Sequence, residues 1–412
     1  MSTSGSPSPP PIRIGVIGAT PARGWGTAAH LPALAVLEDF EVTAVSTTRL
    51  TTARATAEVF GIPLAFADDD ELVSHPDVDA VAITVKVPEH DRLVRAALAA
   101  GKHVFSEWPL GVDLGQASAL AELARASGVR HIVGLQGYQA PGALFVRELI
   151  EVGYIGQPLT VSVVAAGGPA GRRTPQANLY TTDVAAGATV LSISTGHLLA
   201  TLARAVGEFR QLSAVVALVN TETTVIETGQ IVPVTSPDQV VLAGQLANGA
   251  AASVAVQGGA APVTPGFELR IVGTDATLVV RPATPGGIHI TDWAISVAKP
   301  DGSAADLPVP GRFSPVPEAV PAGPPRNVAL LYREFARAIS DGQPAAPDFD
   351  TAVRYHRLLE HIQRASDTGT RQDTGTRQDT GTRQDTGTRQ DTGTRQDTGT
   401  RQDTGTREDT GG

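Results

Sequence analysis

The chain has 412 residues, of which 42% are hydrophobic and 18% are charged, and its formal net charge is −10. This length is enough for two packed domains, because a single hydrophobic core stops growing at about 250–300 residues. The acidic balance argues against a broad electrostatic surface for nucleic acid. The sequence has no cysteine, which excludes disulfides, thiolate catalysis and cysteine-ligated metal centres.

The two ends of the chain differ in composition from the rest. Residues 1–11 are rich in Ser and Pro and lack the basic and apolar regions of a secretory signal. No apolar run reaches the roughly 20 residues that a membrane span requires. From Asp367 to Gly412 the chain repeats Asp-Thr-Gly-Thr-Arg-Gln. We therefore expect a cytoplasmic protein with disordered segments at residues 1–11 and 367–412.

The repeat tail has two interpretations. Each copy is close to neutral and has no large apolar side chain, so nothing offsets the entropy that is lost when the segment orders. A functional interpretation is a multivalent binding array. The interpretation that we favour is an expanded repeat that is tolerated because it is solvated.

Between residues 12 and 136, apolar runs alternate with helical patterns at short intervals. Gly61, Gly101 and Gly128 stand where helix C-caps are expected. Strand and helix alternation of this kind predicts right-handed βαβ units and a parallel sheet. The expected strands are 12–18, 40–47, 78–85, 103–107 and 131–136, and the expected helices are 51–60, 89–100 and 113–127.

After residue 136 the pattern changes to longer, β-branched stretches. Several of them alternate, and turns such as Asn248-Gly249 join them, which predicts an antiparallel sheet in an α+β domain. A Pro-rich loop is expected at 300–325. The expected strands are 159–166, 212–221, 240–246, 251–257, 268–273 and 277–281, and the expected helices are 142–152, 188–206, 328–340 and 351–364.

A glycine-rich loop follows the first predicted strand and precedes a helix. Such a loop lets the backbone approach a pyrophosphate at the helix N-terminus. The loop, residues 18–26, is longer than the strict G-x-G-x-x-G motif, so the prediction rests on its place at the first βα turn. The alternative is a tight turn without a ligand. The residues expected to hold a dinucleotide are Gly15, Gly18, Thr20 and Gly24, with Trp25 covering it.

The end of the second strand bears on which dinucleotide is bound. An acidic residue there bonds the ribose hydroxyl of NAD, whereas Arg accommodates the phosphate of NADP. The sequence offers Ser46, Thr47 and Arg49 and no carboxylate. Hydroxyls with an Arg favour NADP over NAD, although Arg49 is equally compatible with a solvated residue at the start of a helix.

Several motifs together resemble the glucose–fructose oxidoreductase/inositol dehydrogenase (Gfo/Idh/MocA) family over residues 12–364. They are Gly15-x-x-Gly18, His30-Leu31-Pro32-Ala33-Leu34, Pro88-x-His90, Ala100-Gly101-Lys102-His103-Val104 and Glu107-x-Pro109-Leu110. A narrower resemblance is to the branch that contains the fungal galactose-regulon repressor and its bacterial relatives. It is carried by Gly24-Trp25, Val85-Lys86-Val87-Pro88, Glu107-Trp108-Pro109-Leu110-Gly111, Gly187-Ala188-Thr189 and Gly196-His197.

The resemblance implies an α/β fold with two domains. The first is a Rossmann domain with a doubly wound parallel sheet, residues 12–136, and the second is a C-terminal domain with a large, mostly antiparallel open sheet, residues 137–366. Members form dimers or tetramers through these sheets and transfer hydride on sugars or polyols with NAD or NADP. The resemblance adds cofactor-binding roles for Val85, Lys86, Pro88, His90, Glu107, Trp108, Pro109 and Gln136.

The sequence adds an alternative for Glu107, and the resemblance adds a conformation for Pro109. Glu107 follows a strand at the carboxyl edge of the sheet, where it either orients the nicotinamide ribose or caps the helix that follows. Pro109 follows a cis peptide bond in such families.

The sequence departs from the family at the expected catalytic centre. Catalytic members carry a lysine where this chain has Trp108, and an indole cannot relay a proton. The family's aspartates near the catalytic histidine correspond to Ile193 and Ala200. Only His197 of the usual set remains, and it is either a general acid/base or a histidine in the core of an apolar helix.

Two other residues are candidates for proton transfer. Lys86 lies at the end of the fourth predicted strand, where partial burial would lower its pKa and make it a proton relay. It is otherwise a partner for a phosphate or carboxylate, or an exposed lysine. Tyr180 is a candidate hydroxyl donor, with ordinary packing as the alternative. The histidines are scattered without metal-ligand spacing, so no metal is expected.

Two functions remain open. The first is an NAD(P)-dependent oxidoreductase that acts on a sugar, polyol or similar hydroxy or keto compound. The second is a dinucleotide-binding regulator that has kept the fold, lost the chemistry and binds a protein partner. Direct binding to nucleic acid is the least expected outcome, given the acidic balance.

Overall fold

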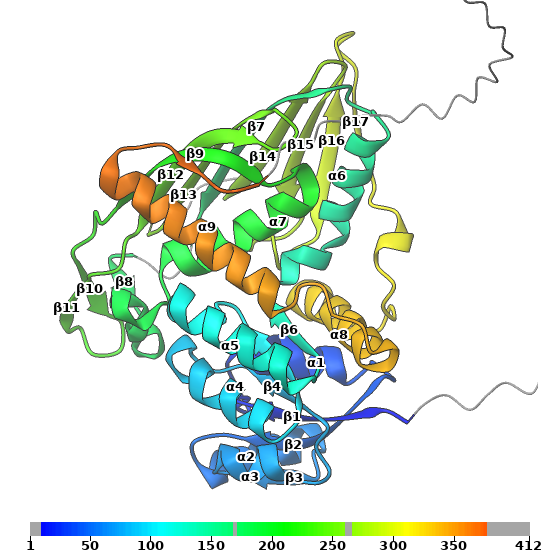
Figure 1. Cartoon of the computed structure of the whole chain (residues 1–412), viewed down its shortest axis with the longest axis vertical. Coiled ribbons are helices and arrows are strands. Elements are labelled where there is room, and N and C mark those ends of the chain that lie inside the picture. The colour runs from blue at the N-terminus through cyan, green and yellow to red at the C-terminus, as the bar shows by residue number, and fades with distance from the viewer. Residues whose placement is uncertain (1–9, 168–170, 260–265, 377–412) are drawn as a thin grey trace, which may run out of the picture. The chain divides into compact units, whose positions relative to one another are not determined.

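The computed structural model describes residues 10–376, except for 168–170 and 260–265 (Figure 1). The first sheet has six strands in the order β3-β2-β1-β4-β5-β6, and every neighbouring pair is parallel. The parallel sheet predicted for this part of the chain is therefore confirmed. Its strands are β1 (Ile12–Ile17), β2 (Phe40–Ser46), β3 (Leu64–Phe66), β4 (Ala80–Ile83), β5 (His103–Glu107) and β6 (His131–Gly134).

The helices between these strands begin and end close to the predicted positions. Gly61 closes α2 with a φ of +67°, a conformation that glycine adopts without steric cost. β3 and α3 were not predicted, because both are short and β3 is only half-buried. The helices of this part are α1 (Leu31–Leu34), α2 (Leu50–Phe60), α3 (Asp69–Ser74), α4 (His90–Ala99) and α5 (Leu114–Ser127), with the π-helical turn η1 (Gly26–His30) before α1.

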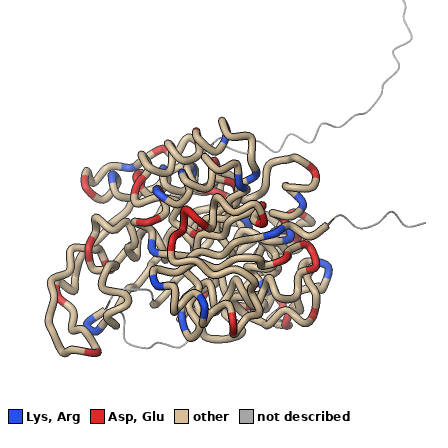
Figure 2. The backbone as a smooth tube through the Cα atoms, turned by 90° about the horizontal axis from the view of Figure 1, so that it is seen from below, with Lys and Arg blue, Asp and Glu red and all other residues tan. Residues whose placement is uncertain are grey.

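Charged residues of both signs are interspersed along the described chain (Figure 2). Arg13 of β1, for example, bonds Asp77 at 2.7 Å and Asp79 at 2.8 Å, which ties β1 to the segment before β4. Ion pairs as exposed as these contribute about 0–1 kcal/mol each. The stability of the fold therefore depends mainly on its apolar cores.

The second sheet has nine strands in the order β17-β16-β15-β14-β7-β13-β12-β9-β18. All neighbouring pairs are antiparallel except β7 and β13, so the prediction of a large, mostly antiparallel sheet is confirmed. Its strands are β7 (Pro158–Ala166), β9 (Phe209–Ala217), β12 (Gln239–Leu246), β13 (Ala251–Gln257), β14 (Phe267–Gly273), β15 (Thr277–Pro282), β16 (Trp293–Ala298), β17 (Ala304–Asp306) and β18 (Gln372–Asp373).

Some elements in this part were not predicted. β16 has the alternating pattern Trp-Ala-Ile-Ser-Val-Ala, which is a strand signal that the sequence contained. The expected helix 188–206 is divided into a π-helical segment, η6 (Val190–Thr195), and α7 (Gly196–Val206). The Pro-rich segment 300–325 contains β17 and a 3-10 turn, η7 (Gly311–Phe313). A small separate sheet is formed by β8 (Arg173–Thr174), β10 (Glu222–Val225) and β11 (Ile231–Pro233).

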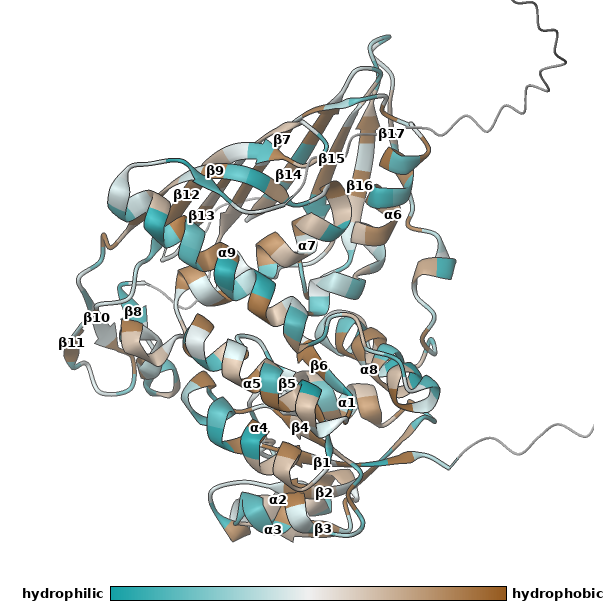
Figure 3. Ribbon diagram, viewed as in Figure 1, coloured by the Kyte–Doolittle hydropathy of each residue, from teal (hydrophilic) through white to brown (hydrophobic). Residues whose placement is uncertain are grey.

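One face of the nine-stranded sheet is covered by α6 (Pro141–Glu151), α7 and α9 (Phe349–Thr368) (Figure 1). Hydrophobic and hydrophilic residues alternate along several of its strands (Figure 3). On the face away from these helices, Val164, Val215 and Val241 are about half exposed or more. An exposed apolar face of this kind is compatible with self-association, and the dimer or tetramer expected from the resemblance stays a prediction.

Helix α8 (Pro324–Asp341) completes the core of the first sheet, although it lies late in the sequence. Its buried Val328, Leu331 and Phe335 pack in one cluster with Ile14 and Phe105 of the parallel sheet. The core that contains β1 and β5 therefore requires residues from both ends of the folded chain. The domain limits by residue number, 12–136 and 137–366, stay a prediction.

The repeat tail was expected to be disordered from Asp367 onward, but its first residues are ordered. α9 extends to Thr368, and Gln372 and Asp373 form β18 on the edge of β9. The Thr374 N–H donates to Arg210 O at 3.0 Å. A polar strand can pair with an edge without burying apolar side chains, because the backbone groups of the edge supply the partners. The predicted disorder of residues 377–412 and 1–9 lies outside the described residues.

Within the part of the chain that the structure describes, no helix is both long enough and apolar enough to cross a membrane.

We predict that Thr374→Pro detaches the ordered start of the repeat tail from β9. Proline removes the N–H that bonds Arg210 O and the hydroxyl that bonds Phe209 O. Hydrogen exchange measured by mass spectrometry should therefore become faster at residues 209–212. Thr374→Ser keeps both groups and should leave exchange as in the parent chain. Equal exchange in the parent and the proline variant would show that β18 does not protect β9.

Candidate functional site

The glycine loop after β1 lies close against the end of β4. Gly18 has a φ of +101°, and a Cβ atom there would come within 2.6 Å of a Val85 methyl group. A Cβ on Gly26 would come within 2.6 Å of the Thr84 hydroxyl. Both positions therefore exclude any side chain. The result is a loop whose backbone, rather than its side chains, faces the carboxyl edge of the sheet, as a pyrophosphate site requires.

The other residues predicted for this loop have different surroundings. Thr20 donates to Arg23 O at 2.5 Å inside the loop, and Gly24 has a φ of +101°, where a Cβ would meet only Gly18 O, at 3.9 Å. Trp25 is half-buried, and its indole N–H has no partner among the described residues. Gly15 lies inside β1, where a Cβ would meet Leu72 of α3 at 2.6 Å. Close packing against Leu72 explains why position 15 is a glycine. A role for Gly15 in cofactor binding stays a prediction.

A carboxylate from a different element, Asp69 of α3, lies at the end of β2, where β2 itself has no acidic residue. The buried Ser46 hydroxyl donates to Asp69 of α3, and Arg92 of α4 donates to the other oxygen of Asp69 at 2.8 Å. Sequence reasoning missed Asp69 because it lies 23 residues beyond Ser46. The only signal was an acidic run, residues 68–71, which also caps α3.

Thr47 and Arg49 follow Ser46 at this edge. The Thr47 hydroxyl is buried and donates to Arg49 O at 2.9 Å, which fixes the start of the loop. Arg49 is exposed, and its guanidinium makes no hydrogen bond or ion pair with any residue that the structure describes. The side chain is therefore available to an anion at this point.

Glu107, at the end of β5, is the centre of a buried hydrogen-bond network. Its carboxylate bonds His30 Nε2 at 2.8 Å and accepts from the Gln136 amide at 2.8 Å. His30 Nδ1 lies 2.7 Å from the Tyr332 hydroxyl. Burial and the Glu107 charge raise the pKa of Tyr332 well above its ordinary value, so the phenol stays protonated and donates to His30. The alternative of a helix cap is wrong for Glu107, because Asp113 caps α5.

His90 holds the ends of two strands together through their backbone. Its ring is buried, with Nδ1 2.8 Å from Pro109 O and Nε2 3.1 Å from Val85 O. Burial lowers the pKa of His90. The peptide bond before Pro109 is cis, as predicted. Pro88, between Val85 and His90, is exposed. His90 can therefore position these loops, and direct contact with a cofactor stays a prediction for it.

Trp108 corresponds in sequence to the family's catalytic lysine, but in the structure it is packed in the core. The indole is 5% exposed, and its N–H donates to Ser192 O at 2.8 Å. Its ring lies 4.7 Å from the ring of His356 on α9. Gly196 leaves room for it, since a Cβ there would lie 2.7 Å from the indole nitrogen. Trp108 therefore links β5 to η6 and α9 and offers no proton-transfer group.

Lys86 and Tyr180, two of the predicted catalytic residues, lie together. The Lys86 ammonium is 4.6 Å from the centre of the Tyr180 ring, which is a cation–π contact. Of the alternatives for Lys86, partial burial is wrong, because the residue is exposed and lies beyond the end of β4 at Ile83. Burial raises the pKa of Tyr180, so the phenol is protonated at neutral pH.

His197, the third predicted catalytic residue, is stacked on His289. The two ring centres are 4.1 Å apart and the planes differ by 8°. His197 is buried, and its Nδ1 has no partner among the described residues. Burial and the neighbouring His289 lower the pKa of His197 well below its ordinary value, and burial lowers the pKa of His289 to about 4. Both rings are therefore neutral at neutral pH.

The surroundings of the two histidines are apolar. A cavity of about 630 Å³ lies beside them and is lined by Ile193, Leu198 and His289, among others. No sequence pattern pointed to His289, since it lies in a loop after Gly286-Gly287, far from His197 in the chain. In residues 10–376 outside the two gaps, no three acidic or histidine side chains gather as a metal site would require.

These features define the class of the protein. A parallel doubly wound sheet with a glycine loop at its first βα turn is a dinucleotide-binding Rossmann domain, here joined to a nine-stranded sheet. Residues 12–135 match the model of an oxidoreductase family with an NAD-binding Rossmann fold, and residues 141–282 match that of the C-terminal domain of Gal80p. The first part of the chain thus matches the Gfo/Idh/MocA oxidoreductases and the second part matches the C-terminal domain of Gal80p, so the resemblance seen in the motifs is confirmed.

Curated relatives include both regulators and dehydrogenases. The galactose/lactose metabolism regulatory protein GAL80 of Saccharomyces cerevisiae is 30% identical over 264 residues, which cover 60% of this chain and 61% of the relative. The dehydrogenase aclE of Aspergillus oryzae is 34% identical over 214 residues, 49% of this chain and 57% of the relative. The chain thus matches about three fifths of the length of these relatives.

Solved structures of both kinds share the fold. A super-repressor mutant of Gal80p from Saccharomyces cerevisiae has a TM-score of 0.77 at 24% identity and covers 88% of this chain and 98% of its own. A levoglucosan dehydrogenase in complex with NADH and L-sorbose has a TM-score of 0.75 at 19% identity, again with 88% and 98% coverage. At these identities the likeness shows the fold alone.

We predict that Tyr332→Phe destabilises the protein by about 1–3 kcal/mol, because it leaves His30 Nδ1 buried without a donor. The measurement is chemical denaturation at neutral pH. Tyr154→Phe is the matched control, since Tyr154 is 38% exposed, and it should cost less than about 0.5 kcal/mol. Equal stability of the two variants would contradict the proposed donor role of Tyr332.

We also predict that acid weakens the fold through its buried histidines. Burial lowers the pKa of both His289 and His356 to about 4 in the folded protein, whereas an unfolded histidine has a pKa of about 6.5. The unfolded state therefore binds more protons between these values. The free energy of unfolding should be unaffected by these groups above pH 6.5 and fall as the pH drops toward 4. His356→Gln should reduce this slope by up to about one proton, and an unchanged slope would contradict the assignment.

Proposed function

We propose that the chain is an NAD(P)-dependent oxidoreductase that transfers hydride to or from a carbon bearing a hydroxyl or keto group, in a sugar, polyol or related compound. The observation that carries this proposal is the contact between Lys86 and Tyr180 at the end of β4, beside the glycine loop. It supplies a proton donor where the family's lysine is missing. Inositol 2-dehydrogenases among the relatives support the substrate class.

The residues of the loop fit a dinucleotide. Gly18 and Gly26 form a cradle that any side chain would fill, and the helical turn that starts after Trp25 presents backbone N–H groups to a pyrophosphate. Glu107, held by His30 and Gln136, is a fixed carboxylate at the same edge and suits a ribose hydroxyl. The nicotinamide, when bound, supplies or accepts the hydride.

The proton is handled by this chain's own side chains. In the direction of reduction, the Tyr180 phenol donates its proton to the carbonyl oxygen of the substrate. The Lys86 ammonium lies over the same ring and stabilises the negative charge that Tyr180 then carries. Because Lys86 is exposed, solvent can return the proton to the phenol. His197 is neutral, buried and stacked on His289, so it takes no part in this proton transfer.

NADP is the proposed cofactor in preference to NAD. Thr47 and Arg49 lie where the adenosine ribose binds in such folds, and the Arg49 guanidinium makes no contact with the described residues. Asp69 lies at the same edge, but Arg92 pairs with its charge at 2.8 Å. A phosphate at Arg49 is therefore not opposed by an unpaired carboxylate.

We predict that Arg49→Ala weakens NADPH binding roughly 10–100-fold, as expected when a charge-assisted hydrogen bond of about 1.5–3 kcal/mol is lost. NADH binding should change less than about 2-fold. Nicotinamide fluorescence titrations measure both. Arg54→Ala, an exposed arginine on α2, is the control. Equal weakening of both cofactors would contradict the NADP assignment, and failure of the parent chain to bind either would overturn the cofactor proposal.

We predict that turnover depends on Tyr180. The assay follows NADPH and NADH absorbance with a panel of sugars, sugar lactones and keto-polyols. Tyr180→Phe should lower kcat by about 10²–10⁴, the range of a positioned proton donor, and leave the Kd for the cofactor unchanged. Lys86→Met should lower kcat in the same direction, whereas Lys299→Met, at an exposed turn, should not. Full activity in Tyr180→Phe would remove the phenol from the mechanism.

A regulatory function is the second candidate, and the burial of Trp108 favours it. The indole replaces the proton-transferring lysine of the family, and Ile193 replaces a carboxylate beside His197. GAL80, a regulatory protein by name, is among the relatives. Micromolar binding of the cofactor with no turnover across the whole panel would favour this candidate, with a protein as the partner.

A further inference from the structure

A second cavity lies on the covered side of the nine-stranded sheet, between α7, α9 and the strands β7, β9, β12 and β13. Its volume is about 540 Å³, within the range of small-molecule sites. None of the residues to which the preceding sections give a role toward cofactor or substrate lines it. Its floor is apolar and includes Leu199, Leu202, Leu246, Ala252, Val254 and Leu358.

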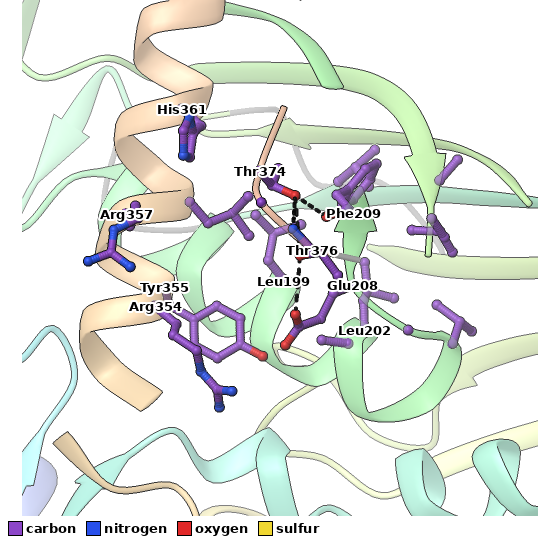
Figure 4. Close-up of a pocket in the computed structure, with 18 of the residues that line it drawn as sticks. Leu199, Leu202, Glu208, Phe209, Arg354, Tyr355, Arg357, His361, Thr374 and Thr376 are labelled. Atoms are coloured by element: carbon purple, nitrogen blue, oxygen red, sulfur yellow. Dashed lines mark hydrogen bonds between the residues drawn. The ribbon is translucent and has the colours of Figure 1, made fainter. Parts of the chain in front are cut away.

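The beginning of the repeat tail lies over one side of this cavity (Figure 4). Thr374 is held on β9 by its N–H, which bonds Arg210 O at 3.0 Å, and by its hydroxyl, which bonds Phe209 O at 2.5 Å. The Thr376 hydroxyl lies 3.5 Å from a Glu208 carboxylate oxygen. The wall of the cavity therefore includes residues 373–376 of the repeat tail.

The polar end of the cavity is formed by Tyr355 and Glu208. Tyr355 is 4% exposed, and its hydroxyl makes no hydrogen bond with any described residue. Figure 4 shows the phenol oxygen and the Glu208 carboxylate directed toward the same part of the cavity. Burial and the Glu208 charge raise the pKa of Tyr355, so its hydroxyl stays protonated. The pair consists of one donor and one acceptor, each with unused hydrogen-bonding capacity.

The charges around the cavity select against a charged ligand. Arg354 and Arg357 are balanced by Glu208 and Asp373, so the four charges together favour neither a carboxylate nor an ammonium ligand, and either of these would lose its hydration on entering an apolar cavity. A neutral hydroxyl group avoids both penalties. It can accept from Tyr355 and donate to Glu208 at the same time, while the rest of the molecule covers the apolar floor.

We propose that this cavity is a binding site for a small apolar molecule that carries one hydroxyl group. The proposal does not depend on the proposed oxidoreductase function. Tyr355 nevertheless lies edge-on to Trp108, with 6.5 Å between the ring centres, so an occupant of the cavity lies one side chain away from the residue that links β5 to η6.

The test compares three ligands with the same tail and different head groups, octan-1-ol, octanoate and octylamine, by isothermal titration calorimetry of the full-length chain. Octan-1-ol is expected to bind with one site per chain, at least 10-fold more tightly than either charged ligand. Tyr355→Phe should weaken octan-1-ol binding about 5–10-fold, which corresponds to roughly 1–1.4 kcal/mol for one hydrogen bond. Tyr154→Phe makes the same change outside the cavity and should leave the affinity unchanged.

A second variant separates this site from the exposed apolar face of the sheet. Ala252 lines the cavity and is 6% exposed. The larger side chain in Ala252→Leu fills part of the cavity, so this variant should abolish octan-1-ol binding. Val215→Ser, on the exposed face, should not. The proposal is overturned if octan-1-ol fails to bind, if the three ligands bind equally, or if binding is lost in Val215→Ser and kept in both cavity variants.

Discussion

The carboxylate of Glu107 is buried at the carboxyl edge of the parallel sheet, and much of the structure follows from the need to compensate it. A buried charge without partners is very costly. Here His30 and Gln136 bond the two carboxylate oxygens, and Tyr332 bonds His30. These partners come from the first helical segment, the turn after β6 and α8. Helix α8 therefore packs on the first sheet for two reasons. Tyr332 completes the hydrogen-bond network of Glu107, and Val328, Leu331 and Phe335 complete the apolar core.

At the same edge of the sheet, the position of the family's catalytic lysine has a packing role in this chain. Trp108 occupies the position of the lysine, but its indole is directed into the core, where it bonds Ser192 and packs on His356. Gly196 makes this possible, because a side chain there would collide with the ring. The chemistry that we propose instead lies at Lys86, which is exposed after β4, and at Tyr180, whose ring Lys86 contacts. The site is therefore either a rearranged catalytic centre or a binding site without one.

Much of the site was recognisable residue by residue in the sequence, but its arrangement was not. Gly18 and Glu107 could be identified from their places after strands. Asp69, Tyr332 and His289 could not, because each is brought to the site by a contact between segments far apart in the chain. Exposure was misjudged for Lys86, since the strand ends before it and leaves the side chain outside the sheet.

By itself, the sequence determined the periodicities, the glycine positions and the family motifs, since these depend on local steric rules and on the alternation of apolar residues. It therefore specified a parallel sheet followed by a mostly antiparallel one. Only the tertiary structure decided that α8 belongs with the first core, that Trp108 is a packing residue and that the start of the repeat tail pairs with β9. Each of these depends on which surfaces remain unpaired once the sheets have formed, and a polar segment such as Gln372–Asp373 carries no local signal of the edge that it completes.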